Sequence, residues 1–441
     1  MATARKSLLQ LFIPISLETL CMMLTGMVDT MMLSSVGDAA VGAVGTANTY
    51  IGVFIIMFNI ISSGMIAVMT QYIGANRPGI AYQAKQIGAI FNFILGIILS
   101  VLLFLFSGKI LEMVGVAPLL LGFAKTYFQI VGGFCILNAV IPIYSSYLRA
   151  FGYTKQPLVA TIIGNLLNLV LNAFFLYVMK WGVAGVAIAT VISRIVNLII
   201  NMVCARLLIS ANKDKARIKN TEVFAQIIKI GLPSAFETAL YNIAMTLTIR
   251  FLNQMDENGL NVTARAYTMQ ITNFSYCVGA ALASANAILT GWYVGAKEYD
   301  RCDKQTKKAV VVGVIVATIL ESFFAIFSGT IMHLFSDDPQ MIKLVGTLLT
   351  IDIVLEIGRV TNLVFGQALK TSGDALFPTI IAAVFMYLCM VLGTYVFGIR
   401  LGLLAVGAYI AMASDECVRA IFMFARWQSG KWRQKTLVED K

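Results

Sequence analysis

Apolar runs of about 20 to 30 residues recur along the whole chain, and they constrain its fold more than any other feature. A helix needs about 20 consecutive apolar residues to cross the hydrocarbon core of a bilayer. Of the 441 residues, 59% are hydrophobic and only 12% are charged. In an ordinary soluble domain about 25% of the residues are charged. We therefore predict an all-α polytopic membrane protein.

The apolar runs define twelve candidate transmembrane helices. They cover residues 8–32, 44–72, 86–107, 119–148, 157–179, 183–208, 224–252, 266–294, 308–330, 341–369, 376–398 and 402–426. Alternate connections carry most of the basic residues: Arg5, Lys6, Arg77, Arg149, Lys155, Lys213, Lys215, Arg217, Lys219, the segment Lys297 to Lys308, Lys370 and the segment Arg426 to Lys441. The opposite connections carry only Lys109, Lys180, Arg265, Lys343 and Arg400. Because cytoplasmic connections are the basic ones, we predict a multi-pass protein of the cell membrane with both termini in the cytoplasm.

A proline-marked stretch occurs near the start of the first and the seventh predicted helix. Pro14-Ile-Ser-Leu-Glu18 is echoed by Pro233-Ser-Ala-Phe-Glu237, and two further pairs follow in the same order: Gly74-Ala75 with Gly295-Ala296, and Leu148-Arg-Ala-Phe-Gly152 with Leu369-Lys-Thr-Ser-Gly373. Because each half has an even number of helices, both enter the membrane in the same direction and form a parallel repeat. The predicted domains are a six-helix lobe at 1–209, a cytoplasmic interlobe linker at 210–222, a second six-helix lobe at 223–426 and a basic cytoplasmic tail at 427–441.

The motif content argues against several classes of function. No G-x-x-x-x-G-K-[ST] phosphate loop occurs, and the sequence suggests no nucleophile with its base and no metal cluster. We predict a protein that is not an enzyme, has no cofactor and binds no nucleic acid. The net charge of +11 is assigned to the cytoplasmic connections. Energy for active transport would come from an H+ or Na+ gradient, which requires ionisable groups at membrane depth.

The first predicted helix carries two carboxylates at membrane depth, Glu18 and Asp29. They are separated by about three helical turns, so they share one face and lie about 16 Å apart along the axis. Pro14 lacks an N–H and would loosen or kink this helix, which makes Glu18 and Pro14 candidates for a gate. The alternative is that Pro14 has no mechanical role, since proline is common in membrane helices.

Asparagines form a polar face on the fifth predicted helix. Asn165, Asn168 and Asn172 recur at helical spacing, and Thr190 lies on the next helix. Amides on a buried face can act simply as hydrogen-bonding links between helices. If they face Asp29, they form a pocket in which its carboxylate can take up a proton or coordinate a dehydrated cation.

The second half carries a different set of charges. Asp352, Glu356, Arg359 and Asn362 form a continuous stripe on the tenth predicted helix. In one interpretation the stripe neutralises itself through intrahelical ion pairs. In the other, Glu237 faces the stripe and Arg359 changes partner during a transport cycle. Three charged residues of the twelfth predicted helix are expected to pair with one another: Asp415, Glu416 and Arg419. Glu321 on the ninth predicted helix has no assigned partner.

Six short motifs follow one another along essentially the whole chain. They are Met27-Val-Asp29-Thr-Met-Met-Leu, Gln71-Tyr-Ile-Gly74-Ala75, Leu148-Arg149 with Gly152 and Pro157, Asn168-x3-Asn172, Gly185-Val-Ala-x-Ala-Thr190 and Gly231-Leu-Pro233. Taken in this order, they resemble the motifs of the multidrug and toxic compound extrusion (MATE) family.

The resemblance implies a 6+6 helical bundle with a V-shaped central cavity. It also implies export of organic, often cationic compounds in exchange for H+ or Na+. When the family's site is carried over position by position, the resemblance implies a first-lobe cation site that consists of Asp29, Asn168, Asn172 and Thr190. Na+ at Asp29 is one possible occupant of this site. Some members have an acidic residue where this chain has Asn172, which leaves the choice between proton and sodium open. Some have an aspartate where this chain has Arg359, so we place no second-lobe cation site at that position.

These observations lead to one functional hypothesis and three alternatives. We expect a monomeric secondary active efflux transporter that exchanges H+ or Na+ for drug-like organic compounds by alternating access. Its partners would be these small molecules and the lipid bilayer. The first alternative is a lipid or lipid-linked oligosaccharide flippase of a related superfamily. A passive channel and a membrane scaffold are the others, and the duplicated charged helices count against a scaffold.

Overall fold

The structure is a computed structural model that describes residues 6–210, 214 and 216–438. Four of the basic residues used for the orientation argument lie outside the described residues: Arg5, Lys213, Lys215 and Lys441.

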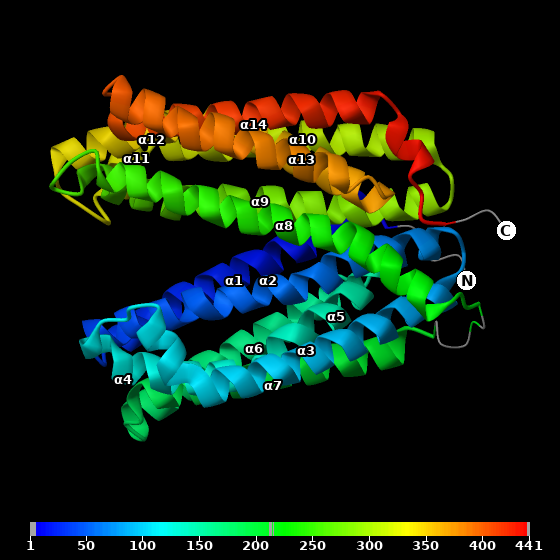
Figure 1. Cartoon of the computed structure of the whole chain (residues 1–441), viewed down its shortest axis with the longest axis horizontal. Helices are drawn as coiled ribbons and strands as arrows, with labels where there is room; N and C mark the ends of the chain where they lie inside the picture. The colour runs from blue at the N-terminus through cyan, green and yellow to red at the C-terminus, as the bar shows by residue number, and fades with distance from the viewer. Residues whose placement is uncertain (1–5, 211–213, 215, 439–441) are drawn as a thin grey trace. The chain divides into compact units, whose positions relative to one another are not determined.

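Helices account for every predicted span of the first half (Figure 1). They are α1 (Leu8–Ser34), α2 (Asp38–Gly74), α3 (Pro78–Met113), α4 (Pro118–Tyr127), α5 (Ile136–Ala150), α6 (Lys155–Ala173) and α7 (Gly182–Leu208). The fourth predicted span is α4 and α5 together, joined through the π-helical turn Phe128–Gly132 and bent by 45° at the break. Pro14 lies inside α1, which continues without interruption from Leu8 to Ser34.

The second half has the same order of long helices. They are α8 (Asn220–Asn253), α9 (Leu260–Gly295), α10 (Tyr299–Ile326), α12 (Pro339–Ser372), α13 (Leu376–Phe385), which continues through the π-helical turns Met386–Val391 and Thr394–Arg400, and α14 (Leu404–Gln428). A short helix, α11 (Ser328–Met332), follows α10. The predicted tail begins at the end of α14, and it packs against the fold through Trp432, which is buried and stacks on Trp427 with ring centroids 4.2 Å apart.

Several helix starts follow from local chemistry. Ser7 and Gln10 form a reciprocal capping box at α1, which satisfies two of the free N–H groups of its first turn. Proline occupies the first position of three other helices, where its missing N–H costs nothing: Pro78 of α3, Pro118 of α4 and Pro339 of α12.

Within the described residues, nine helices are long and apolar enough to cross a membrane, or ten when the bent α4–α5 pair is counted as one span. The two remaining predicted spans are α12 and α14. These helices hold most of the charged side chains that the sequence places within the spans of the second half. Because most of those side chains are buried inside the protein, α12 and α14 do not present their charges to lipid.

The chain divides into two compact units, Met1–Leu232 and Pro233–Lys441. The boundary falls inside α8, so the first turns of this helix pack in the first unit. Gly64 of α2 and Gly231 of α8 allow this crossing. A Cβ on Gly64 would lie 2.0 Å from the Ile227 carbonyl oxygen, and one on Gly231 would lie 1.8 Å from the Ile60 carbonyl oxygen. The lobe and linker bounds drawn from sequence remain a prediction.

The two halves repeat their backbone turns as well as their motifs. After α2, Asn76 has a φ of 58°, and its counterpart after α9, Lys297, has a φ of 60°. After α5, Gly152 has a φ of 83°, and its counterpart after α12, Gly373, has a φ of 104°. Left-handed residues are uncommon, so their recurrence at matching places supports a duplicated fold.

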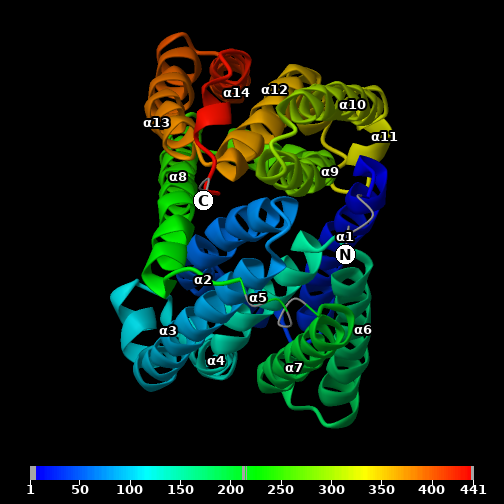
Figure 2. The ribbon, with the colours of Figure 1, turned by 90° about the vertical axis from the view of Figure 1, so that its right-hand side faces the viewer.

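In the second unit, α12 lies among α9, α10 and α14, and Figure 2 shows these helices nearly end-on. Its polar stripe therefore points into the unit. Asp352, Glu356 and Asn362 are all buried. In the first unit, α6 packs between α1 and α7, which brings the asparagine face of α6 toward α1.

Candidate functional site

The polar centre of the first unit is a chain of hydrogen bonds between α1 and α6. Asn172 Nδ2 donates to Asp29 Oδ1 at 2.8 Å and to Asn168 Oδ1 at 3.1 Å. Both asparagines are buried, and Asp29 is half-buried. Asn172 Oδ1 has no hydrogen-bond partner among the described residues. An amide oxygen and a carboxylate are thus available to one small cation or to a proton.

Thr190, the fourth predicted member, contacts this centre indirectly. Its hydroxyl donates to the Val186 carbonyl oxygen at 2.9 Å within α7. The buried Tyr127 hydroxyl lies beside both Thr190 and Asn48, with Asp29 in its electrostatic surroundings. The structure therefore joins three of the four predicted residues directly and places Thr190 at the edge of the same centre.

Arg194 of α7 is a member of this centre that the sequence analysis missed. It interacts electrostatically with Asp29, and its Nη1 atom is buried without a hydrogen-bond partner in the part of the chain that the structure describes. The signal was present, because an arginine inside an apolar span is expensive and marks a functional position. Its positive charge competes with any cation that Asp29 binds.

Glu18 lies elsewhere on α1 and has a structural partner. Arg149 Nη2 of α5 lies 2.7 Å from Glu18 Oε1, and the Thr161 hydroxyl donates to the same oxygen at 3.5 Å. The Glu18 side chain is buried, and that of Arg149 is about a quarter exposed, at 24%. Glu18 therefore links α1 to α5 and α6, about three turns from Asp29.

Glu237 does not meet Arg359 as the hypothesis of partner exchange expected. It pairs with Lys370 Nζ at 2.9 Å and accepts a hydrogen bond from the Thr379 hydroxyl at 3.5 Å. Lys370 lies three helical turns beyond Arg359 on α12, about 16 Å along the axis. Glu237 lies near the depth of Lys370, so its carboxylate pairs there.

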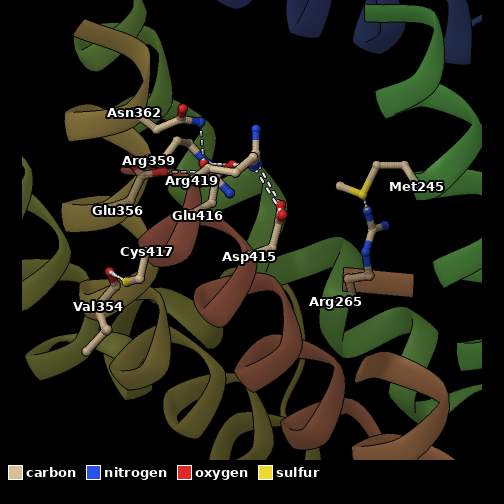
Figure 3. A network of polar contacts seen from close by, with 10 residues as sticks. All are labelled: Met245, Arg265, Val354, Glu356, Arg359, Asn362, Asp415, Glu416, Cys417 and Arg419. Carbon is tan, nitrogen blue, oxygen red and sulfur yellow. Dashed lines mark hydrogen bonds and ion pairs between the residues drawn. The ribbon is translucent and has the colours of Figure 1, made fainter. Parts of the chain in front are cut away.

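Arg359 instead joins a network between α12 and α14 (Figure 3). Its Nη1 pairs with Glu356, and its Nε lies 3.6 Å from Glu416 Oε1. Glu416 also pairs with Arg419 Nη2 at 2.8 Å and accepts from Asn362 Nδ2 at 2.9 Å.

The expected pairing within α14 is therefore only part of this network. Arg419 does bind Asp415 at 2.6 Å, as the helical spacing predicted. Glu416, however, connects this pair to the α12 stripe (Figure 3). Spacing along one helix cannot reveal such a link, because it depends on how two helices are rotated toward each other.

A cavity of about 180 Å³ opens beside this network within the second unit. Its wall includes three tyrosines and three charged side chains: Tyr241, Tyr276, Tyr409, Arg265, Asp352 and Arg359. Arg265 was counted from sequence as a connection residue, but it is buried inside α9. Its Nη2 lies 3.7 Å from the Met245 sulfur (Figure 3). The sequence boundary was too short by about one and a half turns, because the helix starts before its apolar run.

Polar groups buried in each half of a duplicated helical bundle are features of a secondary transporter. The MatE family model matches residues 14–174 and 233–396, with one match in each half. The chain belongs to the MATE family, and it is a transporter rather than an enzyme.

Relatives align over nearly the whole chain. The uncharacterized transporter YisQ of Bacillus subtilis is 33% identical over 435 residues, covering 97% of this chain and 95% of its own. The probable multidrug resistance protein NorM of Thermotoga maritima is 23% identical and covers 98% of this chain and 94% of its own.

A solved structure confirms the predicted architecture. The outward-facing conformation of a multidrug resistance MATE family transporter of the MOP superfamily aligns with a TM-score of 0.84 and 19% identity, covering 97% of this chain and 96% of its own. The protein thus has twelve transmembrane helices in two six-helix lobes and is a multi-pass membrane protein. MATE transporters bind small-molecule substrates and use ion gradients instead of a cofactor.

Proposed function

We propose that this protein is a secondary active efflux transporter that exchanges H+ or Na+ for organic, often cationic, drug-like compounds by alternating access. One observation carries the proposal: Asp29 is held against the buried amides of Asn172 and Asn168. A carboxylate at membrane depth is expensive to keep, so its placement in a polar centre supports a role in ion binding.

The chemistry of this centre suits an ion that binds and leaves. Asp29 supplies the negative charge, and the free Asn172 Oδ1 supplies a neutral oxygen ligand. Arg194 can balance Asp29 when the ion has left, which keeps the empty state from holding an uncompensated buried charge. An ion that binds one conformation more tightly than the other shifts the conformational equilibrium by that difference in affinity.

The test is efflux of a fluorescent organic cation from proteoliposomes, with proton and sodium gradients imposed separately. We expect one of the two gradients to drive uphill efflux. Asp29→Asn should fold normally and abolish gradient-driven efflux. Asp38→Asn, a change at an exposed carboxylate at the start of α2, is the matched control. Normal efflux by Asp29→Asn would exclude Asp29 as the coupling residue.

We also propose that the protein is a monomer of the cell membrane with both termini cytoplasmic and lobes at 1–209 and 223–426. The bond from Lys6 Nζ to the Gly152 carbonyl oxygen at 2.6 Å supports part of this, because it places the start of α1 at the same end as the basic α5–α6 connection. Labelling of single cysteines at positions 155 and 180 with an impermeant reagent would test the orientation, since these positions should face opposite sides.

A lipid flippase is the second candidate, and the cavity of the second unit favours it. Arg265 and Arg359 both line that cavity, and arginine binds phosphate well. The same proteoliposomes distinguish the candidates when they contain a fluorescent anionic lipid. A flippase would move the lipid between leaflets and show no coupled efflux of the organic cation.

A further inference from the structure

Three carboxyl groups of the second unit lie together in its interior. They belong to Glu321 of α10 and to Asp352 and Glu356 of α12, and one oxygen from each lies within 4.8 Å of the other two. Their exposed fractions are 0%, 1% and 0%. Carboxyl groups lie this close in a dry interior only when protons or cations compensate their charge.

The neighbouring arginines do not provide enough compensation. The connected cluster holds five acidic side chains, Glu321, Asp352, Glu356, Asp415 and Glu416, and two basic ones, Arg359 and Arg419. Arg265, across the cavity, adds a third basic group. The acidic side chains still outnumber the basic ones by two, and Glu321 and Asp352 are the two without an ion pair among the described residues.

The hydrogen bonds leave the same region unsatisfied. Neither oxygen of Glu321 has a partner in the described part of the chain, nor do Asp352 Oδ2 and Glu356 Oε2. The Ser275 hydroxyl of α9 is turned toward Glu321, is 1% exposed, and completes no hydrogen bond there. A neutral hydroxyl from a third helix therefore points at the carboxylates, with its own lone pairs unused.

The donor set suits a hard cation. Three carboxylate oxygens that all lie within 4.8 Å of one another are close enough to bind one ion. Ca2+ takes about six to eight oxygen ligands in a flexible geometry, whereas Mg2+ requires a near-ideal octahedron and usually keeps several waters. A buried cluster of protein oxygens therefore favours Na+ or Ca2+ over Mg2+. An ion can reach the carboxyl cluster from the cavity, because Asp352 belongs to the cluster and also lines the cavity wall.

We infer that Glu321, Asp352, Glu356 and Ser275 form a second cation site in the second unit, which takes Na+ or Ca2+. Arg359 is not a ligand of this site. It pairs with Glu356 and holds that carboxylate in place. The site does not depend on the proposed antiport, since it could bind an ion in a protein that transports by another mechanism.

The test measures ion binding without transport. Full-length Asp29→Asn protein in detergent removes the first-lobe carboxylate, so that any remaining ion effect comes from elsewhere. Its thermal unfolding is followed while NaCl or CaCl2 replaces choline chloride at constant ionic strength. We expect a saturable rise in the unfolding temperature with one of these ions, because a ligand that binds only the folded state stabilises that state. MgCl2 at equal ionic strength should give no such rise.

Adding Glu321→Gln to the Asp29→Asn protein should raise the half-saturating ion concentration by at least about tenfold. Loss of a group that only hydrogen-bonds to a metal ligand already lowers metal affinity by about 10- to 100-fold. Ser275→Ala keeps the carboxylates and removes a hydroxyl that holds no hydrogen bond, so it should fold normally and weaken binding less. Glu237→Gln, at a carboxylate paired with Lys370, is the matched control and should leave the ion response unchanged.

Two results would overturn the site: no saturable rise with Na+ or Ca2+ in the Asp29→Asn protein, or the same rise after Ser275→Ala and Glu321→Gln. Equilibrium binding of radioactive Na+ or Ca2+ provides the second measurement if Glu321→Gln unfolds. Failure of the proposed antiport would show differently, as efflux that ignores both gradients while the ion response persists.

Discussion

Glu18 and Arg149 form an ion pair at 2.7 Å that joins α1 to α5 in the first half. The corresponding residues of the second half, Glu237 and Lys370, pair at 2.9 Å between α8 and α12. A threonine donates to each glutamate at 3.5 Å, Thr161 in one half and Thr379 in the other. The duplication thus preserved the ion pair, and the threonines that donate to it come from different repeat positions, while Asp29 has Thr248 at its repeat position.

The two ion pairs should contribute to stability in the same way. Glu18→Gln and Glu237→Gln each leave a basic side chain without its charge partner, a loss that costs about 3–5 kcal/mol when fully buried. Because Arg149 is partly exposed, we expect about 1–2 kcal/mol for Glu18→Gln. A double-mutant cycle with Arg149→Gln, followed by thermal unfolding in detergent, measures the coupling. Strictly additive effects in the cycle would show that the pair contributes nothing as a pair.

Arg194 should weaken ion binding at Asp29. Replacing it with glutamine removes a competing positive charge, so the half-saturating concentration of the coupling ion should fall by about fivefold, equivalent to ~1 kcal/mol. The measurement is initial efflux rate against the ion concentration that drives it. Arg206→Gln, near the end of the same helix, is the control and should leave the concentration dependence as it was. An unchanged or higher half-saturating concentration in Arg194→Gln would contradict the competition.

Two glycines of α2 should respond differently to alanine. A Cβ at Gly64 would lie 2.0 Å from the Ile227 carbonyl oxygen, whereas a Cβ at Gly45 meets nothing within 4 Å. Gly64→Ala should therefore push α2 and α8 apart and destabilise the protein by about 1–3 kcal/mol. Gly45→Ala should be neutral or stabilising by up to about 1 kcal/mol, because alanine is the better helix former. Unfolding temperatures compare them, and equal values would mean that the crossing is not closely packed.

Asp214, in the connection between α7 and α8, should make local stability depend on pH. Its carboxylate accepts from the backbone N–H of Ala216 at 3.0 Å and of Gly79 at 2.7 Å. These bonds hold the pKa of Asp214 below its usual range. A lowered folded-state pKa means that the stabilisation is complete above the ordinary aspartate pKa of about 3.9 and is lost as the pH falls through the folded-state value.

Hydrogen exchange at the Gly79 amide, corrected for intrinsic rates, measures this effect. Protection should be constant from pH 7 to about pH 5 and should fall at lower pH. In Asp214→Asn it should be weak throughout and lose its pH dependence. Protection that persists below the folded-state pKa would mean that another group holds the connection against α3.

The sequence was sufficient for features that depend on one helix at a time. Hydropathy reports the spans because crossing a bilayer is a property of each segment, and all twelve coincide with helices. Helical spacing placed Asn168 and Asn172 on one face, where they form a hydrogen bond, and predicted the pairing of Asp415 with Arg419 for the same reason. The repeat was visible because its motifs recur in order.

Only the tertiary structure decided which groups from different helices meet. Lys370 rather than Arg359 pairs with Glu237, Glu416 joins two helices, and Glu321 lies beside Asp352. These contacts depend on the depth and rotation of one helix against another, and residues distant in sequence set both. The sequence alone therefore determined the family, the helices and the polar residues that share one helix face, while packing determined the partners of almost every buried charge, including Asp29.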